Sequence, residues 1–180
     1  MMESENVLLT GRPGVGKTTV VERLVELARE REAAVRGVFS PEIREDDERV
    51  GFEIADVATG RSEVMAHVEY DDPSVGKYGV DVSAVDEIAH EDIAAEDADL
   101  VVVDEVAPMQ THSDIFVERV RAALDSETPV IAVVQEARET GFVGSVKQRD
   151  DATVVRVTKE NRDEVPDQLA ELVEDSPQTF

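Results

Sequence analysis

Short apolar runs along this chain alternate with longer segments in which apolar residues recur every three or four positions. The short runs are rich in valine and lack the strict alternation of a half-exposed strand. Such runs are typical of a parallel sheet that helices cover on both faces, and the longer segments have the spacing of amphipathic helices. The pattern predicts a three-layer α/β fold with a mostly parallel sheet.

Five core strands and four helices are expected. The strands are residues 6–9, 35–39, 100–103, 130–134 and 153–157, and the helices are residues 18–32, residues 83–95, one that Ser113 caps and one that begins near Pro166. Residues 50–68 break the alternation, because two apolar segments flank a short turn that contains Gly60. This pattern predicts an antiparallel hairpin added to the core, followed by a loop at residues 71–79.

The length of 180 residues is that of one ordinary domain. We expect a single domain over residues 1–174 and a frayed tail at residues 175–180. Fraying is expected there because chain ends make few packing contacts.

Acidic residues dominate the composition, with 42 Asp and Glu against 18 Lys and Arg. This charge opposes binding to nucleic acid and to anionic membranes, since the sequence has no concentrated basic patch. This acidic composition resembles that of cytoplasmic proteins from salt-accumulating halophiles. The chain has no cysteine, no basic segment of a signal peptide and no apolar run near the roughly 18 residues of a membrane span. We expect a cytoplasmic protein, and a monomer rather than an oligomer.

A phosphate-loop pattern (Walker A) lies between the first predicted strand and the first predicted helix. Its glycines let backbone N–H groups point at a phosphate, and the helix N-terminus adds a positive partial charge. Lys17 is expected to reach the β- and γ-phosphates, and the Thr18 hydroxyl to ligate Mg²⁺. The alternative is a plain glycine-rich turn, which a Lys-Thr pair at this offset disfavours. The predicted nucleotide-binding residues are Gly11, Arg12, Pro13, Gly14, Val15, Gly16, Lys17, Thr18 and Thr19.

Two acidic residues follow the apolar run at 100–103. Asp104 comes directly after the run, where a carboxylate is costly to bury unless a cation or hydrogen bonds satisfy it. We therefore expect Asp104 (Walker B) to be the second Mg²⁺ ligand and part of the nucleotide site. Glu105 is in the position of a base that takes a proton from water at the γ-phosphate, which is a hydrolase arrangement. A kinase would hold an acceptor hydroxyl at this place instead.

Further polar residues are candidates for the same site. Gln135 ends the strand at 130–134, and its amide would enter the nucleotide crevice if that strand lies beside the Asp104 strand. A polar residue that merely opens a loop is the alternative. Charge that develops in the transition state usually needs a mobile cation. Arg44 and Lys77 are favoured over Arg49 and Arg138 among cations in or next to predicted loops, although surface ion pairs would also explain them.

The sequence shows no evident motif that recognises guanine. Ala107 stands where a GTP-specific switch has glycine, and the segment 161–164 reads Asn-Arg-Asp-Glu where the base-reading motif ends in Asp. Tolerance of several bases is therefore expected.

Five segments together resemble a known family. They are GRPGVGKTT (11–19), FSPEIRE with RVGFEI (39–54), VGKYGVDV (75–82), LVVVDEVAPM (100–109) and VTKENRDEVP (157–166). They are similar to segments of the small nucleoside-triphosphatase family that includes the human cancer-related nucleoside triphosphatase, in the same order, from about residue 6 to residue 166. Ala107 and Gln110 replace a glycine and a glutamate of that family, and Ser40 replaces a tyrosine.

The resemblance implies a P-loop NTPase with a RecA-like core. It also implies Mg²⁺-dependent hydrolysis of ATP, GTP, CTP, UTP and TTP to diphosphate and phosphate, with slower attack on diphosphates. By position it puts the nucleotide on residues 11–18, the metal on Thr18 and Asp104, and the water on Glu105. A small nucleotide or metabolite kinase and a non-catalytic NTP-binding regulator remain the alternatives.

Overall fold

The computed structural model describes residues 5–174, so the predicted tail at 175–180 lies outside the described residues. Within this range the strands are β1 (Asn6–Thr10), β2 (Val35–Phe39), β3 (Glu42–Glu45), β4 (Glu48–Asp56), β5 (Ser62–His67), β6 (Ser74–Val75), β7 (Tyr78–Val80), β8 (Leu100–Val106), β9 (Val130–Val134) and β10 (Ala152–Arg156). The helices are α1 (Lys17–Glu30), α2 (Val82–Asp92), α3 (Pro108–Thr111), α4 (Asp114–Asp125), α5 (Gly141–Lys147) and α6 (Val165–Glu174), and a 3₁₀ turn spans Ala95–Asp97.

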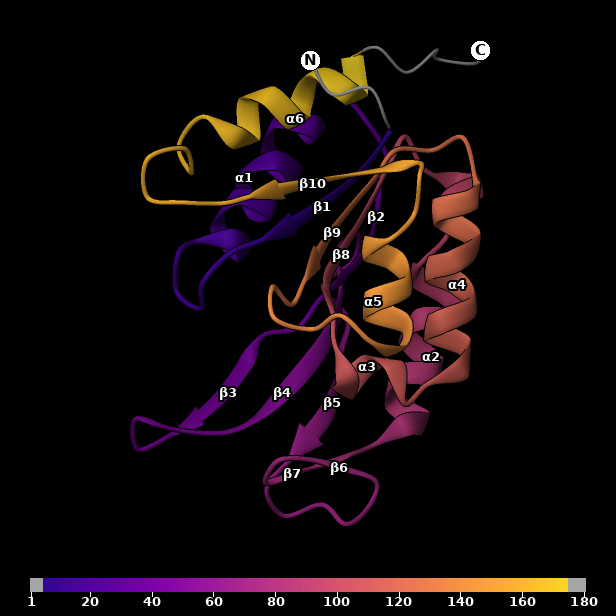
Figure 1. The fold of residues 1–180 in the computed structure, drawn as a ribbon. Helices are drawn as coiled ribbons and strands as arrows, with labels where there is room; N and C mark the ends of the chain where they lie inside the picture. The colour runs from indigo at the N-terminus through magenta and orange to yellow at the C-terminus, as the bar shows by residue number, and fades with distance from the viewer. Residues whose placement is uncertain (1–4, 175–180) are drawn as a thin grey trace.

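All of these strands join one sheet in the order β10-β1-β9-β8-β2-β4-β5-β7-β6, with β3 paired to β4. The half from β10 to β2 is parallel, and the pairings from β2 to β6 are antiparallel. In Figure 1 the antiparallel strands extend below the helix-covered part of the sheet. The predicted fold class, a parallel core with an antiparallel addition, is therefore confirmed.

Helices cover both faces of the parallel half. α1 and α6 lie on one face, and α2, α4 and α5 lie on the other (Figure 1). Successive residues of β1 enter different cores: Leu8 packs beneath α2 and α4, whereas Val7 and Leu9 pack beneath α1. Both faces of the strand are therefore buried, which explains why it reads as a continuous apolar run rather than an alternating one.

Most of the predicted elements are present, and the capping of α4 is confirmed because the Ser113 hydroxyl accepts a hydrogen bond of 3.0 Å from the Phe116 N–H. The predicted hairpin is part of a larger unit that includes β3, β6 and β7. These three strands are short, and β3 is mostly exposed and charged, so no run of apolar residues marked them. The short α5 carries two glycines, which lower helix propensity.

Among residues 5–174, no helix has both the length and the apolar character that crossing a lipid bilayer requires.

The outer face of α1 predicts a salt-dependent stability. Glu22, Glu26 and Glu30 are exposed at i, i+4 spacing, where each like-charged pair destabilises a helix by roughly 0.2–0.5 kcal/mol until salt screens it. With the whole net charge of −24 considered, relief of about 2–3 kcal/mol in molar KCl should raise the midpoint of thermal unfolding by roughly 5–10 °C. Melting curves from 0.1 to 3 M KCl measure this.

Glu30→Gln provides the matched control for the salt series. This variant removes one repulsive pair and an acid from the C-terminal end of α1, so it should be more stable than the parent in dilute buffer. The difference should vanish in molar KCl. A midpoint that is independent of KCl would refute the screening explanation.

Candidate active site

The phosphate loop joins β1 to α1 and leaves the first helical turn open. Gly16 is the N-cap of α1 in a left-handed conformation (φ 111°), and no side chain caps the turn. Its free N–H groups and the positive end of the helix dipole therefore form a site for an anion. Gly11 is also required, because a Cβ at this position would lie 2.7 Å from the Val157 carbonyl oxygen.

Lys17 folds back over its own loop. Its Nζ donates a hydrogen bond of 2.6 Å to the Gly11 carbonyl oxygen. The ammonium group thus lies next to the loop that would enclose a phosphate. A bound phosphate would compete with the Gly11 carbonyl oxygen for the Lys17 ammonium group.

Asp104 on β8 is buried, with 6% of its surface exposed. Burial raises the pKa of its carboxyl to about 6, although a hydrogen bond from Thr18 and the charge of Lys17 oppose the shift. Its Oδ2 is buried and has no hydrogen-bond partner within residues 5–174. The structure thus brings together the two residues that the sequence nominated as metal ligands.

This donor set fits a hard divalent cation. Mg²⁺ prefers oxygen ligands and is usually held by one or two carboxylates together with substrate phosphates and water. A carboxylate with one unpaired oxygen and an adjacent hydroxyl meets that requirement. No cluster of three or more acidic, His or Cys side chains suited to a metal occurs in the described range.

Glu105 follows Asp104 and is partly buried. Burial and the neighbouring Asp104 raise the pKa of its carboxyl, and Lys17 opposes this shift. A carboxylate with a raised pKa is a stronger base than an exposed one, and general bases work best when their pKa approaches the operating pH. The charge of Lys17 thus lowers the pKa of both Asp104 and Glu105.

Strand order places Gln135 close to the phosphate loop. β9 lies between β1 and β8, and its Val133 pairs with Leu9 on one side and with Asp104 on the other. The condition on which the Gln135 prediction depended, that its strand lies beside the Asp104 strand, is thus met. The side-chain oxygen of Gln135 accepts a hydrogen bond of 3.2 Å from Arg138 Nε.

Lys147 of α5 holds the loop that follows β9. Its Nζ donates to the carbonyl oxygens of Gln135, Glu136 and Arg138 at 3.2, 2.8 and 2.9 Å. It also donates to the Glu139 carboxylate at 2.9 Å. Sequence reasoning missed this residue, and the only available signal was the scarcity of lysine in the chain. Lys147 orders the backbone that carries Gln135 and Arg138.

The two favoured cations lie in the antiparallel part of the sheet. Arg44 was expected in or next to a loop, and it lies in β3, two residues before the turn at 46–47, where its guanidinium pairs with the Glu42 carboxylate at 3.0 Å. Lys77 lies between β6 and β7, with its Nζ 5.5 Å from the centre of the Tyr78 ring. Four strands separate β7 from β9 in the sheet. Arg138, by contrast, donates a hydrogen bond to Gln135, which is itself a candidate site residue.

Two departures from the family pattern contact each other. The Gln110 amide, on a residue that is only 2% exposed, donates a hydrogen bond of 2.9 Å to the Ser40 hydroxyl. The residues that replace the family's glutamate and tyrosine therefore form a pair between α3 and the end of β2. Ala107 has an extended backbone (φ −145°), so the loss of glycine at this position introduces no backbone strain.

Comparison with known proteins gives a consistent result over nearly the whole chain. The family model described as NTPase matches residues 6–170. The chain is 43% identical over 170 residues to nucleoside-triphosphatase THEP1 of Methanopyrus kandleri, covering 93% of this chain and 94% of that protein. It is 41% identical to THEP1 of Thermofilum pendens, covering 94% and 95%.

Solved structures agree with this result. The crystal structure of THEP1 from Aquifex aeolicus has a TM-score of 0.80 at 27% identity, covering 94% of this chain and 99% of that one. The solution structure of a human cancer-related nucleoside triphosphatase also has a TM-score of 0.80, at 26% identity, covering 96% and 99%.

Proposed function

This chain belongs to the NTPase family, and from that premise we propose that it hydrolyses ATP, GTP, CTP, UTP and TTP to diphosphate and phosphate. It is a nucleoside-triphosphatase, as its relatives are. The proposal adds that Mg²⁺ is required, that turnover is slow and tolerant of the base, and that diphosphates are attacked more weakly. We also propose that the protein is a monomer in the cytoplasm and that it has no nucleic-acid or membrane partner.

One observation carries this proposal: Thr18 of the phosphate loop contacts the buried Asp104, with Glu105 as the next residue and Lys17 close to both acids. Thr18 and Asp104 are the residues that would hold Mg²⁺. When bound there, Mg²⁺ neutralises charge on the phosphate oxygens. The orphaned Oδ2 of Asp104 supports this assignment, because a buried carboxylate oxygen without a partner is otherwise unfavourable.

The protein groups divide the remaining work. Backbone N–H groups of the loop at 11–18, in which Pro13 has none to donate, hold the phosphates, and Lys17 stabilises negative charge on the β- and γ-phosphates. Glu105 accepts a proton from the attacking water as the oxygen of that water bonds to the γ-phosphorus. The bond to the β–γ bridging oxygen breaks, which yields a nucleoside diphosphate and inorganic phosphate. Gln135 is suited to orient the water or to contact the γ-phosphate.

A further cationic side chain is needed to stabilise the charge that develops on the phosphate in the transition state. Arg44 and Lys77 remain candidates only if the antiparallel extension moves toward the phosphate loop. Arg138 needs no such movement, because it already contacts Gln135.

Hydrolysis assays in molar KCl separate the proposal from its alternatives. With Mg²⁺ and each of the five nucleotides, we expect equimolar diphosphate and phosphate, rates within roughly tenfold of one another, and a kcat below the enzyme median of about 10 s⁻¹. Excess EDTA should abolish release, and Lys17→Ala should show none. Parent release no higher than that of Lys17→Ala would favour the regulator. Transfer to added nucleosides or nucleoside monophosphates that exceeds hydrolysis would favour the kinase.

A further inference from the structure

Lys147 of α5 is bonded to the segment that follows β9, residues 135–139, which we call the β9 loop. The Lys147 side chain is only 10% exposed, and a lysine is rarely buried unless it is paired. Four oxygens of the loop surround its Nζ: three backbone carbonyl oxygens at 2.8–3.2 Å and the Glu139 carboxylate at 2.9 Å. An ammonium group has three N–H donors, so this single loop uses all of them.

The backbone of α5 also packs closely on the β9 loop. A Cβ added at Gly144 would clash with the Glu139 carbonyl oxygen, so a larger residue would fit only if the loop moved. The Gly144 N–H donates a hydrogen bond of 3.1 Å to the carbonyl oxygen of Thr140, the next residue after the loop. The β9 loop is therefore held by α5 in two ways, through the Lys147 ammonium group and through the Gly144 backbone.

The β9 loop adjoins the phosphate loop. Arg156 Nε donates a hydrogen bond of 2.7 Å to the Glu136 carboxylate, and Arg156 is paired in the sheet with Thr10, which directly precedes the phosphate loop. The hydrogen bond from Arg156 lowers the pKa of the Glu136 carboxyl, and the charges of Lys17 and Arg12 lower it further. Both cations of the phosphate loop are thus within electrostatic reach of the β9 loop.

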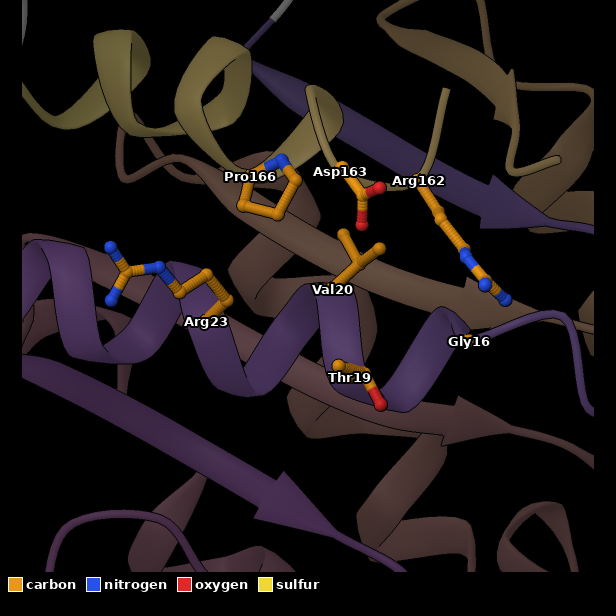
Figure 2. A pocket seen from close by; sticks show the side chains of 7 residues that line it. All are labelled: Gly16, Thr19, Val20, Arg23, Arg162, Asp163 and Pro166. Carbon is orange, nitrogen blue, oxygen red and sulfur yellow. The ribbon is translucent and has the colours of Figure 1, made fainter. Parts of the chain in front are cut away.

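The α6 side of the phosphate loop is built from other elements. A pocket of about 480 Å³ lies there, between the start of α1 and the segment with Arg162 and Asp163 that leads into α6. Figure 2 shows the Arg162 side chain directed toward Gly16, and its Nη1 donates a hydrogen bond of 3.2 Å to the Val15 carbonyl oxygen. α1 and α6 cover one face of the sheet and α5 covers the other (Figure 1). A change at Lys147 should therefore leave this side of the phosphate loop intact.

We propose that Lys147 is a positioning residue for hydrolysis, which holds the β9 loop so that Gln135 and Arg138 meet the γ-phosphate and the attacking water. Arg138 Nε donates a hydrogen bond of 3.2 Å to the Gln135 side-chain oxygen, so the two side chains depend on the same piece of backbone. The contribution of Lys147 belongs to the transition state, because the phosphate loop holds the nucleotide in the ground state. The inference rests on the proposed function and adds that α5 sets the rate without binding the phosphates.

Lys147→Met tests this role, because it keeps the length of the side chain and removes its donors. The kcat should fall by about 10–100-fold, since a misplacement of about 1 Å can cost 10²-fold in rate. The Kd for the imido analogue of ATP with Mg²⁺ should stay within about threefold of the parent value, as expected when only a transition-state interaction is lost. A Kd that rises as much as kcat falls would contradict a positioning role.

Two further variants complete this experiment, which is run in molar KCl below the melting midpoint of every protein. Arg121→Met is the matched control, because it removes an exposed cation that contacts α5, 5.5 Å from the centre of the Phe142 ring; its kcat should equal that of the parent. Gly144→Ala displaces the β9 loop without changing the charge, and it should show the same selective loss of kcat as Lys147→Met. Parent-like kcat in Lys147→Met or in Gly144→Ala would overturn the inference.

A background that lacks both loop side chains shows whether Lys147 acts through them. The variant with Gln135→Ala and Arg138→Ala together should lose at least as much kcat as Lys147→Met. Adding Lys147→Met to this background should lower kcat by less than about threefold, because effects that share one route are not additive. A further loss as large as in the parent would mean that Lys147 acts elsewhere. Parent-like kcat in the variant without the two side chains would also refute the inference.

A mimic of the transition state separates this inference from the proposed function. ADP with Mg²⁺ and aluminium fluoride resembles the phosphoryl group during transfer, and its binding requires no turnover. Its Kd should be about tenfold higher for Lys147→Met than for the parent, whereas ADP with Mg²⁺ alone should bind both proteins equally. A parent that releases no phosphate would count against the proposed function. Equal Kd values for the aluminium fluoride complex would count against the role of Lys147.

Discussion

Glu105→Gln should lower phosphate release by about 10²–10⁴-fold, which is the usual contribution of a general base. The amide keeps the size of the side chain but cannot accept the proton of the attacking water. The Kd for the Mg²⁺-bound nucleotide should stay within about threefold of the parent value, because the loop that holds the phosphates is unchanged. Single-turnover release and an equilibrium titration with the imido analogue of ATP measure the two quantities.

Glu127→Gln is the matched control for this experiment. Glu127 is an exposed glutamate in the segment between α4 and β9, and its replacement removes the same charge away from the site. Its rate should equal that of the parent. If Glu105→Gln also hydrolyses at the parent rate, the base is not Glu105. If it loses nucleotide affinity as well as rate, the residue acts in binding rather than in proton transfer.

Asp104→Asn should reduce Mg²⁺-dependent hydrolysis by at least about 100-fold, since metal-ion catalysis supplies several kcal/mol of charge stabilisation in the transition state. The expected loss appears as a weaker response of rate to Mg²⁺ concentration. Activity titrated with MgCl₂ in molar KCl measures this. Parent-like dependence on Mg²⁺ in the variant would remove Asp104 from the metal site.

The same substitution should change stability in a direction that depends on pH. Burial raises the pKa of Asp104 in the folded chain from its ordinary 3.8 to about 6, so the folded state binds the proton more tightly than the unfolded state does. Ionisation of Asp104 therefore costs the folded state nothing below pH 3.8, an increasing amount from pH 3.8 to 6, and the full amount above pH 6. That full amount is about 3 kcal/mol.

Urea unfolding of the nucleotide-free proteins in molar KCl tests this linkage. The free energy of unfolding of Asp104→Asn minus that of the parent should become more positive by up to about 3 kcal/mol between pH 4 and pH 7. Glu105 titrates differently in the two proteins, because the charge of Asp104, in addition to burial, raises its pKa in the parent, and the remaining acids largely cancel from the difference. A difference that does not vary with pH would contradict the raised pKa. A buried ionised carboxylate of this kind weakens the fold, and its proposed role as a metal ligand would explain why the cost is tolerated.

Local chemistry in the sequence was sufficient to place the glycine-rich turn between β1 and α1 and the acidic pair in β8. The strand before Gly11 and the strand that contains Asp104 are continuous apolar runs, and the helix that begins at Lys17 has apolar residues at helical spacing. Their positions could therefore be inferred without knowledge of the fold. Thr18 and Asp104 were also expected to lie near each other. Thr18 is in the helix that follows β1, Asp104 is in β8, and the carboxyl ends of parallel strands meet at the same edge of the sheet. The cations were harder to place, because an arginine at a strand end and an arginine in an ion pair look alike in a sequence.

What the sequence determined by itself is therefore the class of fold, along with the set of groups that we propose to hold phosphate. Only the tertiary structure decided which distant groups join them. The insertion of β9 between β1 and β8 brought Gln135 and Arg138 close to the phosphate loop, and the packing of α6 on α1 created the pocket at Asp163. The physical reason is that strand order and helix docking depend on burial summed over the whole core, which no short segment encodes.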